Sequence, residues 1–164
     1  DGEVTAPDGP EGLRRSIYLY VGRKVPVTML HLFDQPMISV NCTRRGTSTL
    51  ASQALDLLNS DFMIRQAELF ADRLLRESPP SGWGEAAFDP SAGVVYAFKC
   101  AFGRAPASDE LAESVAFIRQ QSLNPMAGTA SIAASRDTIQ QAQRRALADL
   151  CHMLLSSNEF VYAD

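Results

Sequence analysis

Residues 48–77 read STLASQALDLLNSDFMIRQAELFADRLLRE, and this stretch decides the fold class. Its first part carries apolar residues at the three- and four-residue spacing of one helix face, namely Leu50, Ala54, Leu55, Leu57 and Leu58. Thr47, Ser48 or Thr49 can supply the oxygen that caps the helix start. Asn59 suits its C-terminal end, so the pattern predicts one helix over these residues.

A second helix is predicted directly afterwards, from Phe62 to about Glu77, with Ser60 or Asp61 as its N-terminal cap. Its apolar stripe is Phe62, Met63, Ala67, Phe70, Leu74 and Leu75. Because the connection is so short, we expect the two helices to form a tight helical corner.

Three further helices are predicted towards the C-terminus. Asp89 is an N-cap before Pro90 at the first position of a helix that runs to Phe102 and stops at Gly103. The next spans Ser108 to about Gln121. The longest spans about Arg136 to Ser156, with a buried stripe of Ile139, Ala142, Ala146, Leu147, Leu150 and Leu154.

The connecting and terminal segments lack this periodicity. Residues 78–84 and 122–135 have loop compositions, and residues 158–162 are expected to pack an aromatic tail. Residues 13–25 fit a helix or a strand and end at Pro26. Residues 28–33 fit a short helix that ends near Asp34, whereas residues 36–45 are expected to be irregular or extended.

These patterns predict an all-α fold, a compact orthogonal helical domain of four to five main helices with an extended N-terminal segment. We expect residues 1–12 to form a mobile leader and residues 13–164 a single helical domain. The chain has no initiator Met, so we expect a mature product or the C-terminal part of a longer protein. No signal peptide is visible at its start.

Composition excludes several classes of function. The 164 residues are 46% hydrophobic and 21% charged, which is typical of a globular domain. The net charge of −4 argues against a general nucleic-acid binder. No apolar run approaches the roughly 20 residues of a membrane span, so none is predicted.

The three cysteines are Cys42, Cys100 and Cys151, and their spacing matches no metal or redox motif. Cys100 and Cys151 lie in apolar helical runs and are expected to be buried thiols. A disulfide between them remains an alternative in an oxidising compartment. Cys151-His152 resembles the end of a haem-attachment motif, but Ala148 stands where its first cysteine belongs.

Residues suited to catalysis are few. His31 and His152 are the only imidazoles, and we interpret the pair of His31 with Asp34 as a surface or capping contact. Glu68 and Asp72 fit a solvated helix face. We therefore predict no catalytic residue, no metal site and no cofactor in this segment, and the chain is favoured as a non-enzyme.

Arginine doublets are the most visible polar feature. Guanidinium groups bind carboxylates, sulfates and phosphates through two parallel hydrogen bonds, so converging doublets would form an anion site. The doublets are Arg14-Arg15, Arg44-Arg45 and Arg144-Arg145, and the competing interpretation is ion pairing with Asp and Glu or contact with helix C-terminal carbonyls. Asn59 and Asn158 are explained by helix-end capping. The candidate ligand-binding residues are Arg14, Arg15, Arg44, Arg45, Asn158 and Glu159.

Several short motifs, taken in order, resemble one known family. They are Arg14-Arg15-Ser16-Ile17-Tyr18-Leu19-Tyr20, Val25-Pro26, Phe33-Asp34, Cys42-Thr43-Arg44-Arg45, Ser48-Thr49, Gln53-Ala54-Leu55, Leu57-Leu58-Asn59, Ala101-Phe102-Gly103-Arg104-Ala105-Pro106, Asp109-Glu110-Leu111, Leu154-Leu155 and Asn158-Glu159-Phe160-Val161-Tyr162. The family is the planctomycete PSD domain, a domain of unknown function (1553). Members usually have Pro before the Gln-Ala-Leu run, where this chain has Ala51-Ser52.

The resemblance implies a context and no activity. Such domains form the C-terminal part of large exported bacterial proteins that carry an N-terminal cytochrome c-like domain, so it implies a periplasmic or cell-surface location. Haem would then belong to upstream domains. The expected partners are those upstream domains or another protein.

Three functions are compatible with these observations. The leading one is a non-catalytic helical module of an exported, cytochrome-associated bacterial protein that mediates packing within or between chains. An alternative is part of an enzyme site, for redox chemistry or sulfated-glycan breakdown, to which Arg44, Arg45, Asn158 or Glu159 contributes. Another is a module that binds anions or anionic glycans through the arginine doublets.

Overall fold

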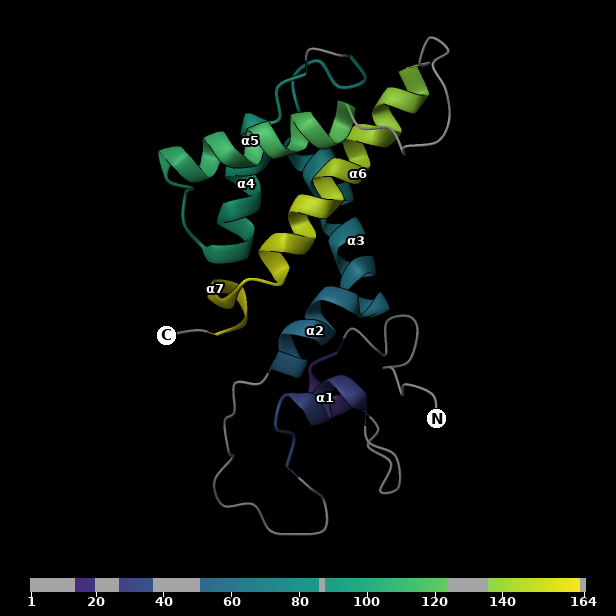
Figure 1. Ribbon diagram of the computed structural model, residues 1–164, viewed down its shortest axis with the longest axis vertical. Coiled ribbons are helices and arrows are strands. Elements are labelled where there is room, and N and C mark those ends of the chain that lie inside the picture. Colours follow the sequence, from purple (N-terminus) through teal and green to yellow (C-terminus); the bar gives the residue numbers. More distant parts are fainter. Residues whose placement is uncertain (1–13, 20–26, 37–50, 86–87, 124–135, 163–164) are drawn as a thin grey trace. The chain divides into compact units, whose positions relative to one another are not determined.

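The computed structural model describes residues 14–19, 27–36, 51–85, 88–123 and 136–162 (Figure 1). These residues form seven α-helices and one 3-10 helix, and they contain no strand beyond an isolated bridge between Ser81 and Asp89. The predicted all-α class is confirmed. The chain divides into two compact units, Asp1–Phe62 and Met63–Asp164, which are described separately.

The first unit contains three short helices, η1 (Ser16–Tyr18), α1 (Thr28–Leu32) and α2 (Ala51–Asn59). Within the segment predicted as helix or strand, the described residues form only the single 3-10 turn η1. The amide of Gln53 on α2 donates to the backbone oxygen of Leu32 at 2.8 Å, which ties α2 to the end of α1. Predictions for residues 1–12, 36–45 and 47–49 fall wholly or largely outside the described residues.

The two predicted helices of the opening stretch are confirmed as α2 and α3 (Asp61–Glu77), separated only by Ser60. The side chain of Asn59 donates to the backbone oxygen of Leu55 at 3.0 Å, so it caps the last turn of α2 as expected. In α3 the buried residues are Met63, Ala67, Ala71 and Leu74. Three of the four belong to the predicted stripe, and Ala71 extends it.

The second unit adds α4 (Ser91–Phe102), α5 (Ser108–Leu123), α6 (Arg136–Leu155) and α7 (Asn158–Val161) to α3. Figure 1 shows α5 lying across α4 and alongside α6, the longest helix. Their shared core consists of small and aliphatic residues with two aromatic rings: Ala67, Ala71, Leu74, Phe88, Val94, Ala97, Phe98, Ile118, Ala146, Leu147, Leu150, Cys151 and Leu154.

The start of α4 differs by one residue from the prediction. The helix begins at Ser91 because the backbone of Asp89 is engaged in the bridge with Ser81. The Asp89 carboxylate still caps the helix, since its Oδ1 accepts from the backbone nitrogen of Ser91 at 3.1 Å and from its hydroxyl at 2.6 Å. At the other end, Gly103 adopts a φ of 72° and donates to the Lys99 oxygen at 3.1 Å.

Three expectations prove wrong in detail. Cys100 is exposed, because it lies off the face of α4 that buries Val94, Ala97 and Phe98. Both Cys100 and the buried Cys151 are free thiols, so the structure contains no disulfide between them. The aromatic tail is not packed away: Phe160 is 43% exposed and Tyr162 is 42% exposed. On the short helix α7, the exposed Glu159 side chain binds Arg104.

The last two helices keep close to their predicted bounds. Helix α5 continues to Leu123, two residues into the predicted loop, and the Ser122 hydroxyl donates to the Ile118 oxygen within its final turn. Helix α6 ends at Leu155 and also buries Gln143, a polar residue outside its predicted stripe. None of the helices in the described ranges has the length and apolar content to cross a membrane.

Gly103→Ala is expected to destabilise the protein by about 1 kcal/mol, because a residue with a side chain resists the left-handed conformation at a φ of 72°. No atom lies within 4 Å of the added carbon, so backbone strain is the main cost. Urea unfolding measures the difference.

The matched control is Gly93→Ala in the same helix, where the new carbon lies 3.6 Å from the Ser78 oxygen, an ordinary contact. This substitution should be neutral or stabilise by up to about 1 kcal/mol, since alanine favours helix interiors. Equal destabilisation by both substitutions would contradict the role given to Gly103.

Candidate functional site

The predicted ligand-binding residues fall in different parts of the chain. Arg14 and Arg15 are exposed beside η1 in the first unit, and Arg44 and Arg45 lie outside the described residues. Asn158 and Glu159 form the first turn of α7 in the second unit. Of this set, Glu159 is the residue whose contacts define a charged cluster.

Glu159 binds Arg104, which follows the end of α4, through two parallel hydrogen bonds. Arg104 Nε donates to one carboxylate oxygen at 2.6 Å, and a terminal guanidinium nitrogen donates to the other at 2.8 Å. This bidentate arrangement is the strongest geometry for an arginine–carboxylate pair. It joins residues 55 positions apart in the sequence.

A second carboxylate, that of Glu110, lies on another edge of the same guanidinium. The two terminal nitrogens of Arg104 donate to its oxygens at 2.7 and 2.8 Å. Glu110 Oε2 also accepts from the backbone nitrogen of Ala107 at 2.7 Å, which satisfies a free N–H at the start of α5. Glu110 therefore caps its own helix and anchors Arg104 at once.

The remaining donor of Arg104 points to the backbone oxygen of Ala105 at 3.2 Å, so all five N–H groups of the guanidinium are used. The same group lies over two rings, 5.7 Å from the centre of Phe98 and 5.5 Å from that of Phe102. Arginine in this position is attracted by the negative faces of the rings. Arg104 thus connects the ends of α4, α5 and α7.

Both carboxylates of this cluster are held in their charged form. Hydrogen bonds from Arg104 and from the Ala107 backbone lower the pKa of Glu110 from 4.5 to about 2. Arg104 also lowers the pKa of Glu159, while the nearby charge of Glu110 opposes this effect. The paired carboxylates raise the pKa of Arg104. Groups that keep their charge across the neutral range are suited to holding helices together, not to proton transfer.

Gln143 on α6 forms a second polar connection, here inside the core. Its side-chain oxygen accepts from the backbone nitrogen of Gly84 at 2.9 Å, and its nitrogen donates to the Glu85 oxygen at 2.8 Å. Gly84 has a φ of 83°, and a side chain there would meet Gln140 at 2.7 Å. The loop after α3 is therefore fixed on α6 by a buried amide.

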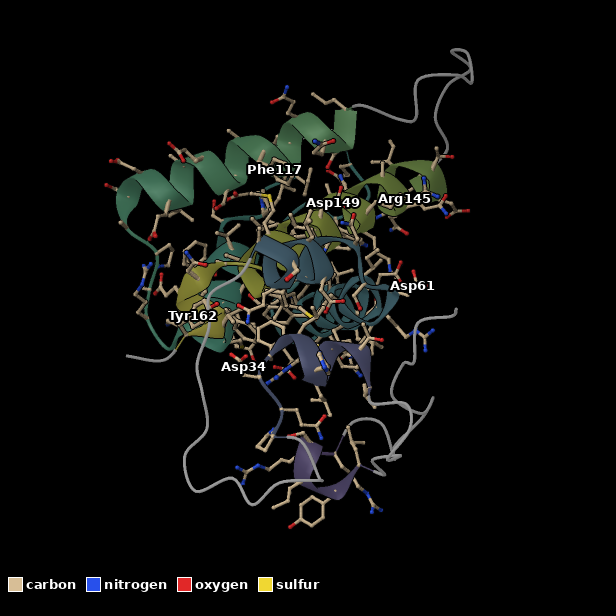
Figure 2. All side chains as sticks on the ribbon, turned by 60° about the horizontal axis from the view of Figure 1, so that its bottom comes forward. Asp34, Asp61, Phe117, Arg145, Asp149 and Tyr162 are labelled. Atoms are coloured by element: carbon tan, nitrogen blue, oxygen red, sulfur yellow. The ribbon has the colours of Figure 1, made fainter. Side chains whose placement is uncertain are left out.

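The third arginine doublet confirms the ion-pairing interpretation for one member. Arg144 forms a bidentate pair with Asp72 on α3, at 2.6 and 2.9 Å, which lowers the pKa of that carboxyl. Arg145 lies one turn before Asp149 on α6 (Figure 2). Asp149 is an exposed residue, but partial burial of its carboxyl raises the pKa of this group. The positive charges of His152 and Arg145 oppose this shift.

A further cluster links α3 to α4. The Tyr96 hydroxyl donates to Glu77, and Arg73 donates to the other Glu77 oxygen at 3.1 Å. These hydrogen bonds lower the pKa of Glu77. Because all three side chains contact each other on an exposed face, they fix α3 against α4.

A metal site and a reactive buried thiol each place requirements on the described residues. These residues contain no group of three or more His, Cys, Asp or Glu side chains arranged to hold a metal ion. Burial raises the pKa of the Cys151 thiol to about 12, so this group is a neutral core residue at physiological pH.

Sequence reasoning missed Arg104 and Gln143 as organising residues. Arg104 stood in a motif quoted for the family resemblance, between the helix-ending Gly103 and Pro106, and Glu110 lies three residues after the N-cap of α5. A glutamate three residues after the N-cap is one of the two partners in a capping box, and this spacing could have predicted that Glu110 binds the Ala107 backbone. No local signal distinguished Gln143 from the exposed glutamines beside it.

The fold and these clusters define an all-α protein in which charged side chains join helix ends. Comparison of sequences gives the family: residues 3–118 match PSD1, described as a protein of unknown function (DUF1553), so the chain belongs to that family. The match includes Arg104 and Glu110, whereas Glu159 lies beyond it. No curated protein and no solved structure matches the chain significantly.

Acid is expected to weaken the fold through Glu110. Its folded pKa of about 2 lies below the ordinary value of 4.5, so its contribution is complete above pH 4.5 and is lost as pH falls towards 2. In Glu110→Gln, the free energy of unfolding should be lower at neutral pH and should fall less steeply between pH 4.5 and 2. Urea titrations at several pH values measure this slope.

The matched control for charge is Glu113→Gln, one turn further along the exposed face of α5. It should retain the acid-dependent slope of the unmodified chain. An identical slope in Glu110→Gln would show that Glu110 is not linked to folding.

Gln143→Met should destabilise the protein by about 1–3 kcal/mol, because a side chain of similar volume leaves the Gly84 N–H and the Glu85 oxygen without their buried partner. Chemical unfolding measures the loss. Gln141→Met on the exposed side of α6 is the control and should change stability by less than about 0.5 kcal/mol.

Proposed function

We propose that this chain is a non-catalytic helical module that packs against upstream domains of the same polypeptide, in an exported, cytochrome-associated bacterial protein. Family membership by itself gives a domain of unknown function. Export, a periplasmic or cell-surface location and association with a cytochrome c domain are supported by the family resemblance.

The observation that carries the packing role is a set of exposed apolar side chains near the C-terminal end of the second unit. Met153 on α6 is 55% exposed, and Phe160 and Tyr162 are exposed by more than two fifths. Exposed aromatic and methionine side chains are enriched in protein interfaces, where burial of their large apolar area contributes free energy. All three lie between residues 153 and 162.

The charged groups of the same unit support this assignment. Arg104, Glu110 and Glu159 contact each other, as do Arg144 and Asp72. These five side chains join helices, and the packing that we propose relies on the exposed apolar side chains instead. An upstream domain of the same chain is the occupant we propose for it.

The test is a binding measurement between two purified parts: this chain and the polypeptide encoded immediately upstream of it. Phe160→Ser combined with Tyr162→Ser should weaken the association by about tenfold or more, because each ring loses buried area. Since both side chains are already exposed, the thermal midpoint should change little.

Leu123→Ser is the matched control, an apolar side chain that is 75% exposed at the end of α5. It should leave the association unchanged. If the double substitution binds as tightly as the unmodified chain, this surface does not carry the packing. In the full reading frame, the proposal also expects a signal peptide and a CxxCH haem motif upstream.

A further inference from the structure

The two carboxylates on Arg104 are held unequally. Glu110 belongs to the first turn of the 16-residue α5 and has a second anchor in the Ala107 backbone. Glu159 belongs to the four-residue α7, and among the described residues its carboxylate contacts Arg104 alone. Glu110 is therefore a permanent ligand of the guanidinium, and Glu159 is the one that can leave.

The charges of the cluster also favour release of one of the two carboxylates. One guanidinium faces two carboxylates, so each carboxylate repels the other across the shared cation. Glu110 keeps its position through the helix start of α5. The cluster would retain a neutral pair if Glu159 were removed, and Arg104 would still lie over Phe98 and Phe102.

Packing adds little to hold α7 in place. None of its residues is buried, and Phe160 and the following Tyr162 expose their rings. The cap of α7 is local, since Ser157 accepts from the Phe160 backbone nitrogen at 3.3 Å and donates to the Leu154 oxygen. The bidentate pair with Arg104 is thus a long-range tether of this helix that does not depend on buried apolar contacts.

We propose that Arg104 is a binding site for a peptide carboxylate, which Glu159 fills from within the chain and which an acidic segment of a partner protein can take over. The inference rests on the proposed function, because it names the chemistry by which a docking partner is recognised. The hydrogen bonds to Glu110 fix the orientation of the guanidinium, and the rings of Phe98 and Phe102 pack against one of its faces.

The resident occupant indicates what the partner must offer. The edge formed by Arg104 Nε and a terminal nitrogen accepts both oxygens of one carboxylate. The occupying sequence is Glu159 followed by Phe160, Val161 and Tyr162, with its aromatic rings exposed. A partner segment should therefore carry a glutamate or aspartate that can present both carboxylate oxygens to this edge.

The experiment uses the full chain carrying Glu159→Gln, with a labelled peptide of residues 157–164 as the probe. Removal of the resident carboxylate should increase affinity for the peptide by about tenfold or more over the unmodified chain, measured by fluorescence anisotropy. A peptide with Gln at the Glu159 position should bind about tenfold more weakly. Glu113→Gln is the control chain and should bind like the unmodified one.

Two results obtained with Arg104 in place would overturn the inference. One is a folded Glu159→Gln chain that binds the peptide no better than the unmodified chain does. The other is equal binding of the Glu and Gln peptides, which would remove the carboxylate from recognition. Adding Arg104→Gln to the same chain should abolish the gain, and retention of the gain would exclude Arg104.

Hydrogen exchange on the unmodified chain keeps the test independent of how the variant folds. The backbone amides of residues 158–162 should exchange faster than those of α5, since α7 opens by itself. Exchange of both segments in one step would contradict a releasable α7. If the peptide assay fails while the chain still binds its upstream polypeptide, this inference is wrong and the proposed function stands. If the peptide binds as expected but the upstream polypeptide does not, the proposed function is wrong.

Discussion

A single guanidinium, that of Arg104, holds three helix ends of the second unit together. Its five N–H groups donate hydrogen bonds to Glu110, Glu159 and the Ala105 backbone, and it lies over two aromatic rings. Helix ends expose unpaired backbone groups and bury little apolar area, so polar contacts must fix their geometry. Gly103 makes this possible, because its left-handed turn ends α4 directly before the arginine.

Inside the core, a neutral side-chain amide connects two segments in the way that the ion pairs do at the surface. Gln143 satisfies two backbone groups of the loop after α3, and small residues such as Ala71 and Ala97 are buried in the apolar core. A buried amide that is fully hydrogen-bonded specifies one position of the loop, whereas apolar contacts alone tolerate several. Polar side chains of this unit thus serve its architecture.

Such a distribution of groups bears on function. The ion pairs of Arg104 with Glu159 and of Arg144 with Asp72 connect helices, and the packing role that we propose uses exposed apolar side chains such as Met153. The exception is Glu159, whose ion pair tethers a helix with no buried residue. One contact then serves both as a structural connection and as a point of exchange with a partner.

The sequence by itself determined the class of fold and, within a few residues, the bounds of α1 to α6, because caps, helix-ending glycines and apolar periodicity act locally. It did not determine which side chains meet, since Arg104 and Glu159 are 55 residues apart and Asp72 and Arg144 are 72 apart. Cys100 and Phe160 were misplaced for the same reason. Tertiary packing decides which face of each helix is covered, and local sequence patterns do not predict which residues far apart in the chain will meet there.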